Sequence, residues 1–219
     1  MSSHCSGHLR FETNHEKATQ ALNYLARAQG GRINKMKALK LIFFADRYHL
    51  RKYGRPIVGD AYWAMSYGPV ASMVMNIADN DDWLDSCERE YANQFVQSSE
   101  DHHFVEAIGD LDQRVFSSSD LEALNFVWSK LGRLGPWDLV DLSHGYPEWQ
   151  KHRESLQLGT CKRAPMEYSD FFLDPDPKDS SFAVTGMADV FADVVDQAQK
   201  EVAQELAEER SRIESFWNG

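Results

Sequence analysis

Three polar residues follow the most apolar stretch of the chain and have the types needed for acid–base chemistry. Asp46, Arg47 and His49 come directly after the sequence LIFFA. On a helix, Asp46 and His49 share a face, so the carboxylate could orient the imidazole as half of a catalytic dyad. No Gly-x-Ser-x-Gly elbow or comparable nucleophile motif accompanies the pair. We therefore favour a structural polar pair that fixes the end of a buried helix, with His144 as a further structural polar residue.

Metal chemistry has weaker support in the sequence. Cys5 and His8 are three positions apart, but no matching Cys or His pair occurs elsewhere to complete a zinc site. The acidic run Asp79–Asp82 lacks the glycine and the distal glutamate of a calcium loop. The phosphate-binding sequences GxxxxGK[ST] and GxGxxG are also absent. We expect no metal site, no cofactor and no catalytic residue.

The charge distribution separates the chain into two parts. The net charge is −11, and the segment from Ala164 onward holds 13 acidic and 4 basic residues. An acidic segment repels the phosphates of nucleic acid. Its role could be to attract a basic partner or only to form a solvated helix. A locally basic stretch from Lys35 to Arg55 leaves DNA binding open, but the remaining chain is not basic, so we disfavour it.

Composition points to a globular protein of the cytoplasm. Aromatic residues are 12% of the chain, which is too many for a disordered protein. No apolar run is long enough for a membrane span, and the N-terminal residues contain no hydrophobic signal core, so we expect no export. The three scattered cysteines do not form a disulfide framework. We expect a cytoplasmic location and no membrane contact.

Two helices at the start of the chain must position the polar residues. Apolar spacing predicts a helix from His15 to about Gln29, ended by glycines. Asn34 should cap a second helix that runs to about Tyr53 and stops at Gly54. This helix is apolar nearly all round in its middle, which predicts a central, buried position. The expected core residues are Leu41, Phe43, Phe44, Trp128 and Trp149.

The turn after this helix has an unusual composition. A short strand is expected at 62–65, and Gly68-Pro69 should then begin a helix with proline at its first position. Glycine permits backbone conformations closed to other residues, and Tyr67 can pack over the turn. The turn is an architectural device that can also hold a rigid surface patch.

The later sequence continues the helical pattern with one interruption. Residues 91–115 predict a small β-hairpin, and the sequence from Ser119 to Glu122 predicts a capping box before another helix. A short helix should run from Pro136 to Ser143, followed by a turn and a last helix of the body. The predicted fold class is mainly α: a compact helical domain with a small β-hairpin element, plus a C-terminal amphipathic helix.

We expect three parts: a domain over 1–163, a Pro/Asp-rich linker over 164–187, and an acidic amphipathic helix over 188–219. Apolar residues recur in the last part at helical spacing. They are Phe191, Val195, Ala198, Val202, Leu206, Ile213 and Trp217.

Three sequence blocks resemble the Panacea domain, the SocA-like antitoxin family. They are Lys40–Phe44, the His-Leu…Gly-x-Pro step from His49 to Pro56, and the Ala…Tyr-Gly-Pro-Val turn from Ala64 to Val70. The segment Leu142–His152 is similar to the family's Leu-Ser/Thr-His…Pro-x-Trp sequence. The resemblance covers about Ile33 to His152. Met65 stands where an aromatic residue is common.

The resemblance implies an antitoxin of a two-gene toxin–antitoxin module, often linked to phage defence. It implies a cognate protein toxin as partner and leaves open a DNA-binding autoregulator or an adaptor that delivers the toxin to a protease. We expect the partner-binding residues to lie at the turn and on the C-terminal helix. They are Arg55, Tyr67, Gly68, Pro69, Val195, Val202, Leu206 and Trp217.

Overall fold

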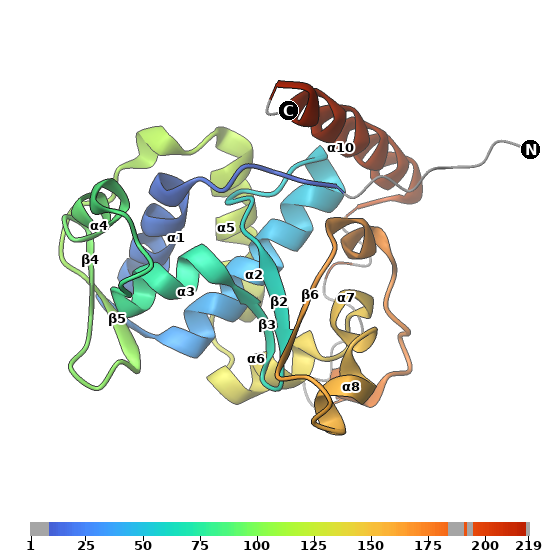
Figure 1. Cartoon of the computed structure of the whole chain (residues 1–219), viewed down its shortest axis with the longest axis horizontal. Coiled ribbons are helices and arrows are strands. Elements are labelled where there is room, and N and C mark those ends of the chain that lie inside the picture. Colours follow the sequence, from blue (N-terminus) through green and yellow to red (C-terminus); the bar gives the residue numbers. More distant parts are fainter. Residues whose placement is uncertain (1–8, 184–190, 192–194, 218–219) are drawn as a thin grey trace, which may run out of the picture.

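The computed structural model describes residues 9–183, 191 and 195–217 (Figure 1). Its helices are α1 (His15–Ala28), α2 (Lys35–Tyr53), α3 (Ser72–Asp79), α4 (Ser86–Ala92), α5 (Ser118–Leu131), α6 (Pro136–Ser143), α7 (Pro147–Gln150), α8 (Arg153–Gln157), α9 (Ser180–Ala183) and α10 (Gln197–Trp217). Its strands are β1 (Arg32–Asn34), β2 (Tyr62–Met65), β3 (Gly68–Ala71), β4 (Val96–Ser98), β5 (Phe104–Ala107) and β6 (Arg163–Pro165). Two 3-10 turns, η1 (Gln113–Val115) and η2 (Tyr168–Phe172), complete the described elements. The predicted mainly α class is confirmed.

Helix α2 runs through the centre of the molecule, with α5, α6 and α10 against it. The Asn34 side chain accepts a hydrogen bond from the Lys37 N–H, and Gly54 ends the helix with a left-handed φ of 70°. Both predicted ends are therefore confirmed. Three of the expected core residues on or near this helix, Leu41, Phe43 and Phe44, are fully buried.

The two expected tryptophans differ in burial. Trp149 is 3% exposed and belongs to the core. Trp128 is partly buried and packs against the edge of the core. Within the described residues, no helix combines the length and the apolar character needed to cross a membrane.

The strands form two small antiparallel sheets. The first has the order β1-β5-β4, and its β4–β5 hairpin confirms the hairpin expected within 91–115. The second has the order β3-β2-β6, with Ala64 opposite Pro69 on one side and opposite Ala164 on the other. This second sheet joins a strand of the predicted linker to the body.

The expected helix start at Gly68-Pro69 is wrong. These residues begin strand β3, which lies at a sheet edge, where a proline without an N–H is tolerated. Helix α3 begins later, at Ser72. Its first N–H groups are capped by Asp60, whose carboxylate accepts from Met73 N and Val74 N at 3.0 Å. Because this cap comes from outside the helix sequence, the local pattern gave no sign of it.

The expected capping box is also displaced, by two residues. Ser117 caps α5 and exchanges hydrogen bonds with Asp120, so the box is Ser117–Asp120 rather than Ser119–Glu122. Asp120 supplies the side-chain acceptor that a capping box needs at its fourth position. Ser119 instead contacts His49.

The last helix of the body consists of two short helices, α7 and α8, in place of one. The segment after Arg163 contains ordered elements that contact the body. Strand β6 pairs with β2, and Phe171 in η2 is fully buried. Farther on, Phe191 is 2% exposed and stacks on Phe44.

Helix α10 begins at Gln197 and lies at one edge of the molecule, across the end of α2 (Figure 1). Asp174 connects the two helices, because its carboxylate pairs with Arg51 at 2.5 Å and with Lys200 at 2.7 Å. The sequence-based division into domains stays a prediction.

Candidate functional site

The tip of the β2–β3 hairpin holds the turn singled out in the sequence. Gly68 has a φ of 86°, which an L side chain rarely adopts. A Cβ atom at this position would overlap the Ser143 Oγ and lie 3.1 Å from the Lys40 Cε. The glycine is therefore required by both the backbone conformation and the close approach of α2 and α6.

Lys40 ties the turn to the central helix. Its side chain is 1% exposed, and its Nζ donates to the Pro69 carbonyl at 2.6 Å. Burial lowers the pKa of Lys40 to about 7, because the ammonium is removed from water. The lysine thus holds the hairpin from inside the protein.

The segment Leu142–His152 supports the same hairpin from the other side. The Trp149 indole N–H donates to the Met65 carbonyl at 2.9 Å. The His144 ring stacks on Trp149, with 3.7 Å between the ring centroids. Burial, together with the nearby charges of Lys40 and Arg153, lowers the pKa of His144 to about 4, so the imidazole is neutral near pH 7. Sequence blocks that are far apart in the chain therefore meet at one turn.

Two aromatic side chains project into solvent at the tip of this hairpin and beside it. Tyr67 at the hairpin tip is 61% exposed, and Trp137 near the start of α6 is 60% exposed. Their rings are perpendicular, with centroids 5.4 Å apart. We call Tyr67 and Trp137 the tip surface. Sequence reasoning identified Tyr67 but missed Trp137. The signal for Trp137 was its position directly after Gly135-Pro136, at the start of a predicted helix.

The expected pair of Asp46 and His49 does not form. Asp46 accepts from Ile57 N at 2.8 Å, from Val58 N at 3.1 Å and from the Tyr62 hydroxyl at 3.1 Å. Burial raises the pKa of Asp46 to about 7 against the opposing effect of these donors. Asp46 fixes the loop between α2 and β2, and the dyad interpretation loses its geometric basis.

His49 fixes the other part of that loop. Its Nδ1 lies 2.6 Å from the Arg55 carbonyl oxygen, and its Nε2 lies 2.9 Å from the Ser119 Oγ. Burial lowers the pKa of His49 to about 4, so the ring is neutral near pH 7. His144 lies in the separate cluster at the hairpin tip and does not join Asp46 and His49.

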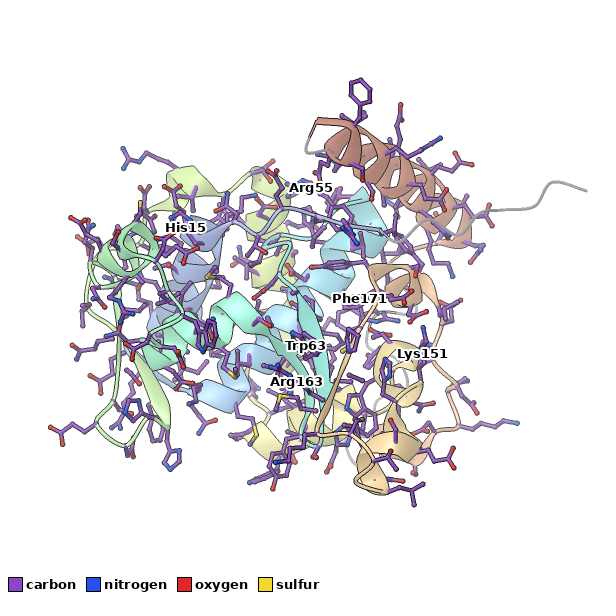
Figure 2. All side chains as sticks on the ribbon, viewed as in Figure 1. His15, Arg55, Trp63, Lys151, Arg163 and Phe171 are labelled. Carbon is purple, nitrogen blue, oxygen red and sulfur yellow. The ribbon has the colours of Figure 1, made fainter. Side chains whose placement is uncertain are left out.

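Arg55, expected on a binding surface, takes part in an internal network. Its guanidinium pairs with the buried Asp120 at 2.8 Å, and Lys17 pairs with the same carboxylate at 2.7 Å. Burial alone would raise the pKa of Asp120, but the hydrogen bonds from Lys17 and Ser117 and the Arg55 charge bring it below its usual value. In Figure 2, Arg55 lies near α10, away from the hairpin tip.

The basic residues that left DNA binding open are also engaged. Arg47 forms a fully buried pair with Glu148 at 2.8 Å, and Arg51 donates to the Phe171 carbonyl. Every basic residue of the 35–55 stretch donates to an acceptor within the protein. They are Lys35, Lys37, Lys40, Arg47, Arg51, Lys52 and Arg55. The stretch therefore serves internal structure and gives the DNA interpretation no support.

The predicted apolar stripe of the C-terminal helix is divided between two surroundings. Val195 is buried, whereas Val202 and Leu206 are about half exposed, at 56% and 48%. Trp217 belongs to α10, but its side chain lies outside the described part of the chain. Cys5 and His8 also lie outside the described residues. Among the residues that are described, no group of three or more potential metal-binding side chains occurs.

Comparison with protein families identifies a domain in this chain. The family model of the antitoxin SocA-like, Panacea domain matches residues 39–150, slightly more than half of the chain. The match contains α2 from Leu39 onward, the hairpin tip and most of the segment that supports it. No curated protein and no solved structure matches the chain. The chain belongs to the SocA-like antitoxin family that is defined by the Panacea domain.

Proposed function

We propose that this chain is an antitoxin that binds a cognate protein toxin and neutralises it stoichiometrically, without turning over a substrate. The observation that carries this proposal is the tip surface inside the matched domain. Two large aromatic side chains are exposed to water there, one on α6 and the other on a hairpin that side chains of α2 and α7 fix in place. Exposed tryptophan and tyrosine side chains dominate the energy of many protein interfaces.

The rigidity of the tip surface favours binding. The turn that carries Tyr67 is fixed by Lys40 and Trp149, so little conformational freedom remains to be lost on association. The aromatic rings also supply contact area with few rotatable bonds. A toxin that covers both rings would remove them from water at a low entropic cost.

The proposal is tested by expressing the chain with the product of its adjacent reading frame. We expect that product to arrest growth by itself and to be harmless when the chain is present. The purified proteins should form a complex of fixed stoichiometry, measured by light scattering after size-exclusion chromatography. The half-life of the toxin should be unchanged; a half-life shortened by the chain would favour a protease adaptor.

A double variant locates the contact. Tyr67→Ala with Trp137→Ala should weaken the complex more than about tenfold, as expected for central aromatic contacts. Trp83→Ala is the matched control, because Trp83 is 85% exposed but lies elsewhere, in the loop before α4. Absence of protection by the wild-type chain would contradict the proposed function. Full binding by the double variant would show that the tip surface does not contact the toxin.

A further inference from the structure

Helix α10 is attached to the body through small residues. Ala203 and Ala207 are buried, at 1% and 0% exposure, and face Gly54 at the end of α2. A Cβ atom on Gly54 would lie 2.6 Å from the Ala203 carbonyl oxygen, which shows how closely the two helices approach. Ser211, one turn farther along this face, accepts a hydrogen bond from Arg10 N at 2.9 Å. This inner face accounts for the docking of α10.

The large apolar residues of α10 lie mainly outside this inner face, with Leu206 at the boundary, where its Cβ would lie 2.9 Å from a Cβ on Gly54. Val202, Ile213 and Phe216 are 56%, 52% and 79% exposed, and Leu206 is about half exposed. Their spacing of four, seven and three positions places them along one side of the helix. We call these four residues the outer stripe. Since the inner face already holds the helix, the packing of α10 leaves the exposure of this stripe unexplained.

Acidic side chains flank the outer stripe. One shallow hollow is lined by Val202, Leu206 and three exposed glutamates, Glu205, Glu208 and Glu209, with Arg212 beside them. A second hollow, around Ile213 and Phe216, shares Glu209 and Arg212. Helix α10 itself carries five acidic and three basic residues, so the helix that bears the stripe is negative overall. Such a surface combines apolar contact with attraction for cations.

We propose that the outer stripe is a second docking surface for the toxin and that its occupant is a basic amphipathic segment. This segment would place aliphatic or aromatic side chains on the stripe and lysine or arginine side chains beside the glutamates. The inference rests on the proposed function and adds the chemical character of the partner. Apolar contact supplies most of the affinity, and the complementary charge sets the rate and the register of association.

A second copy of this chain fits the stripe poorly. An antiparallel pair of α10 helices centred on the stripe would bring Glu208 and Glu209 of one copy against the same residues of the other. Like charges placed together at an interface cost several kcal/mol. Nucleic acid is disfavoured for the same reason, because its phosphates would meet the glutamates.

The apolar contribution is tested with Val202→Gln and Ile213→Gln together. Glutamine is helix-compatible and leaves the charge unchanged, so circular dichroism should show an intact helix content. Binding of the adjacent-frame product, measured by calorimetry, should weaken more than about tenfold. Leu158→Gln is the matched control, because Leu158 is 70% exposed at the end of α8 and should bind within about twofold of wild type.

The charge contribution is tested by reversing Glu205, Glu208 and Glu209 to lysine. The association rate should fall about tenfold at low salt and should lose most of its dependence on ionic strength. Unchanged binding and rates in both variants, while the wild type still binds and protects, would overturn the inference and leave the proposed function standing. A wild-type chain that neither binds nor protects would overturn both. A dimer of the isolated chain that the Val202→Gln and Ile213→Gln variant dissociates would assign the stripe to a second copy and would also overturn the inference.

Discussion

The hairpin tip and helix α10 present apolar residues to solvent in two different ways. At the tip, Tyr67 stands on a turn whose carbonyls accept from the buried side chains of Lys40 and Trp149. Helix α10 instead rests on two alanines and a partly exposed ion bridge through Asp174. We therefore expect the tip to unfold together with the core, and α10 to separate from the body at a smaller cost in free energy.

This difference in attachment implies that the two surfaces would recognise a partner in different ways. A surface that is built into the core has a single conformation before binding, which favours specificity. A helix that packs through small side chains and a solvent-exposed ion bridge can adjust its position to a partner, and its acidic flanks can attract that partner from a distance. Perturbations of the core should therefore affect the tip and α10 together, whereas perturbations of the α10 contacts should affect α10 alone.

The largest effect is expected from Asp46, which fixes the base of the hairpin. Its folded-state pKa of about 7 lies above the ordinary value of an aspartate, so the folded protein binds the additional proton. The contribution of Asp46 to stability should therefore fall as the pH rises from about 4 to about 7, whereas the contributions of His49 and His144 rise over much of that range. Asp46→Asn removes this titration. The unfolding free energy of the variant minus that of the wild type should therefore rise by about 2–4 kcal/mol over that range. The other titrating groups remain in both proteins. The assignment would therefore be contradicted if unfolding free energies from urea titrations changed with pH in the same way for the variant and the wild type.

Gly68→Ala should give the next largest effect. The alanine would have to adopt a φ of 86°, and its Cβ would overlap the Ser143 Oγ. We therefore expect the unfolding free energy, measured with urea, to fall by about 2–3 kcal/mol. Gly159→Ala is the control, since Gly159 has a φ of 68° with nothing within 4 Å of the added atom, and should cost about 1 kcal/mol. Equal losses in the two variants would show that the contact with Ser143 is not restrictive.

Gly54→Ala should act mainly on α10. The added Cβ would lie 2.6 Å from the Ala203 carbonyl oxygen and 2.9 Å from the Leu206 Cβ, so the helix must move away from α2. We expect a loss of about 1–2 kcal/mol, with hydrogen-exchange protection reduced in α10 but kept in α2 and α5. A uniform loss of protection across the protein would indicate that α10 belongs to the cooperative core.

The smallest effect is expected from the ion bridge. The Asp174 side chain is 62% exposed, so its pairs with Arg51 and Lys200 are screened by solvent. Asp174→Asn should lower stability by less than about 0.5 kcal/mol and should increase protease cleavage near α10 slightly. A loss comparable to that of Gly54→Ala would mean that the bridge, rather than the small inner face, holds the helix.

The sequence determined the elements whose signals are local. The central helix was predicted with both ends correct, because its N-cap, its apolar middle and its terminal glycine lie within or beside the helix itself. The β4–β5 hairpin, the α6 helix and the motifs of the family were likewise recognisable from short stretches. These features depend on residues a few positions apart, whose interactions are the same in any fold.

Tertiary structure decided what depends on distant residues. Gly68-Pro69 became a strand because β2 lies beside it and Asp60 caps the following helix. Arg55 and His49 turned inward because Asp120 and Ser119 of another helix meet them. The apolar stripe of α10 faces outward because Gly54 lets the alanine face approach α2 more closely than larger side chains could. Helical spacing gives the faces of a helix, but packing against the rest of the protein selects which face is buried.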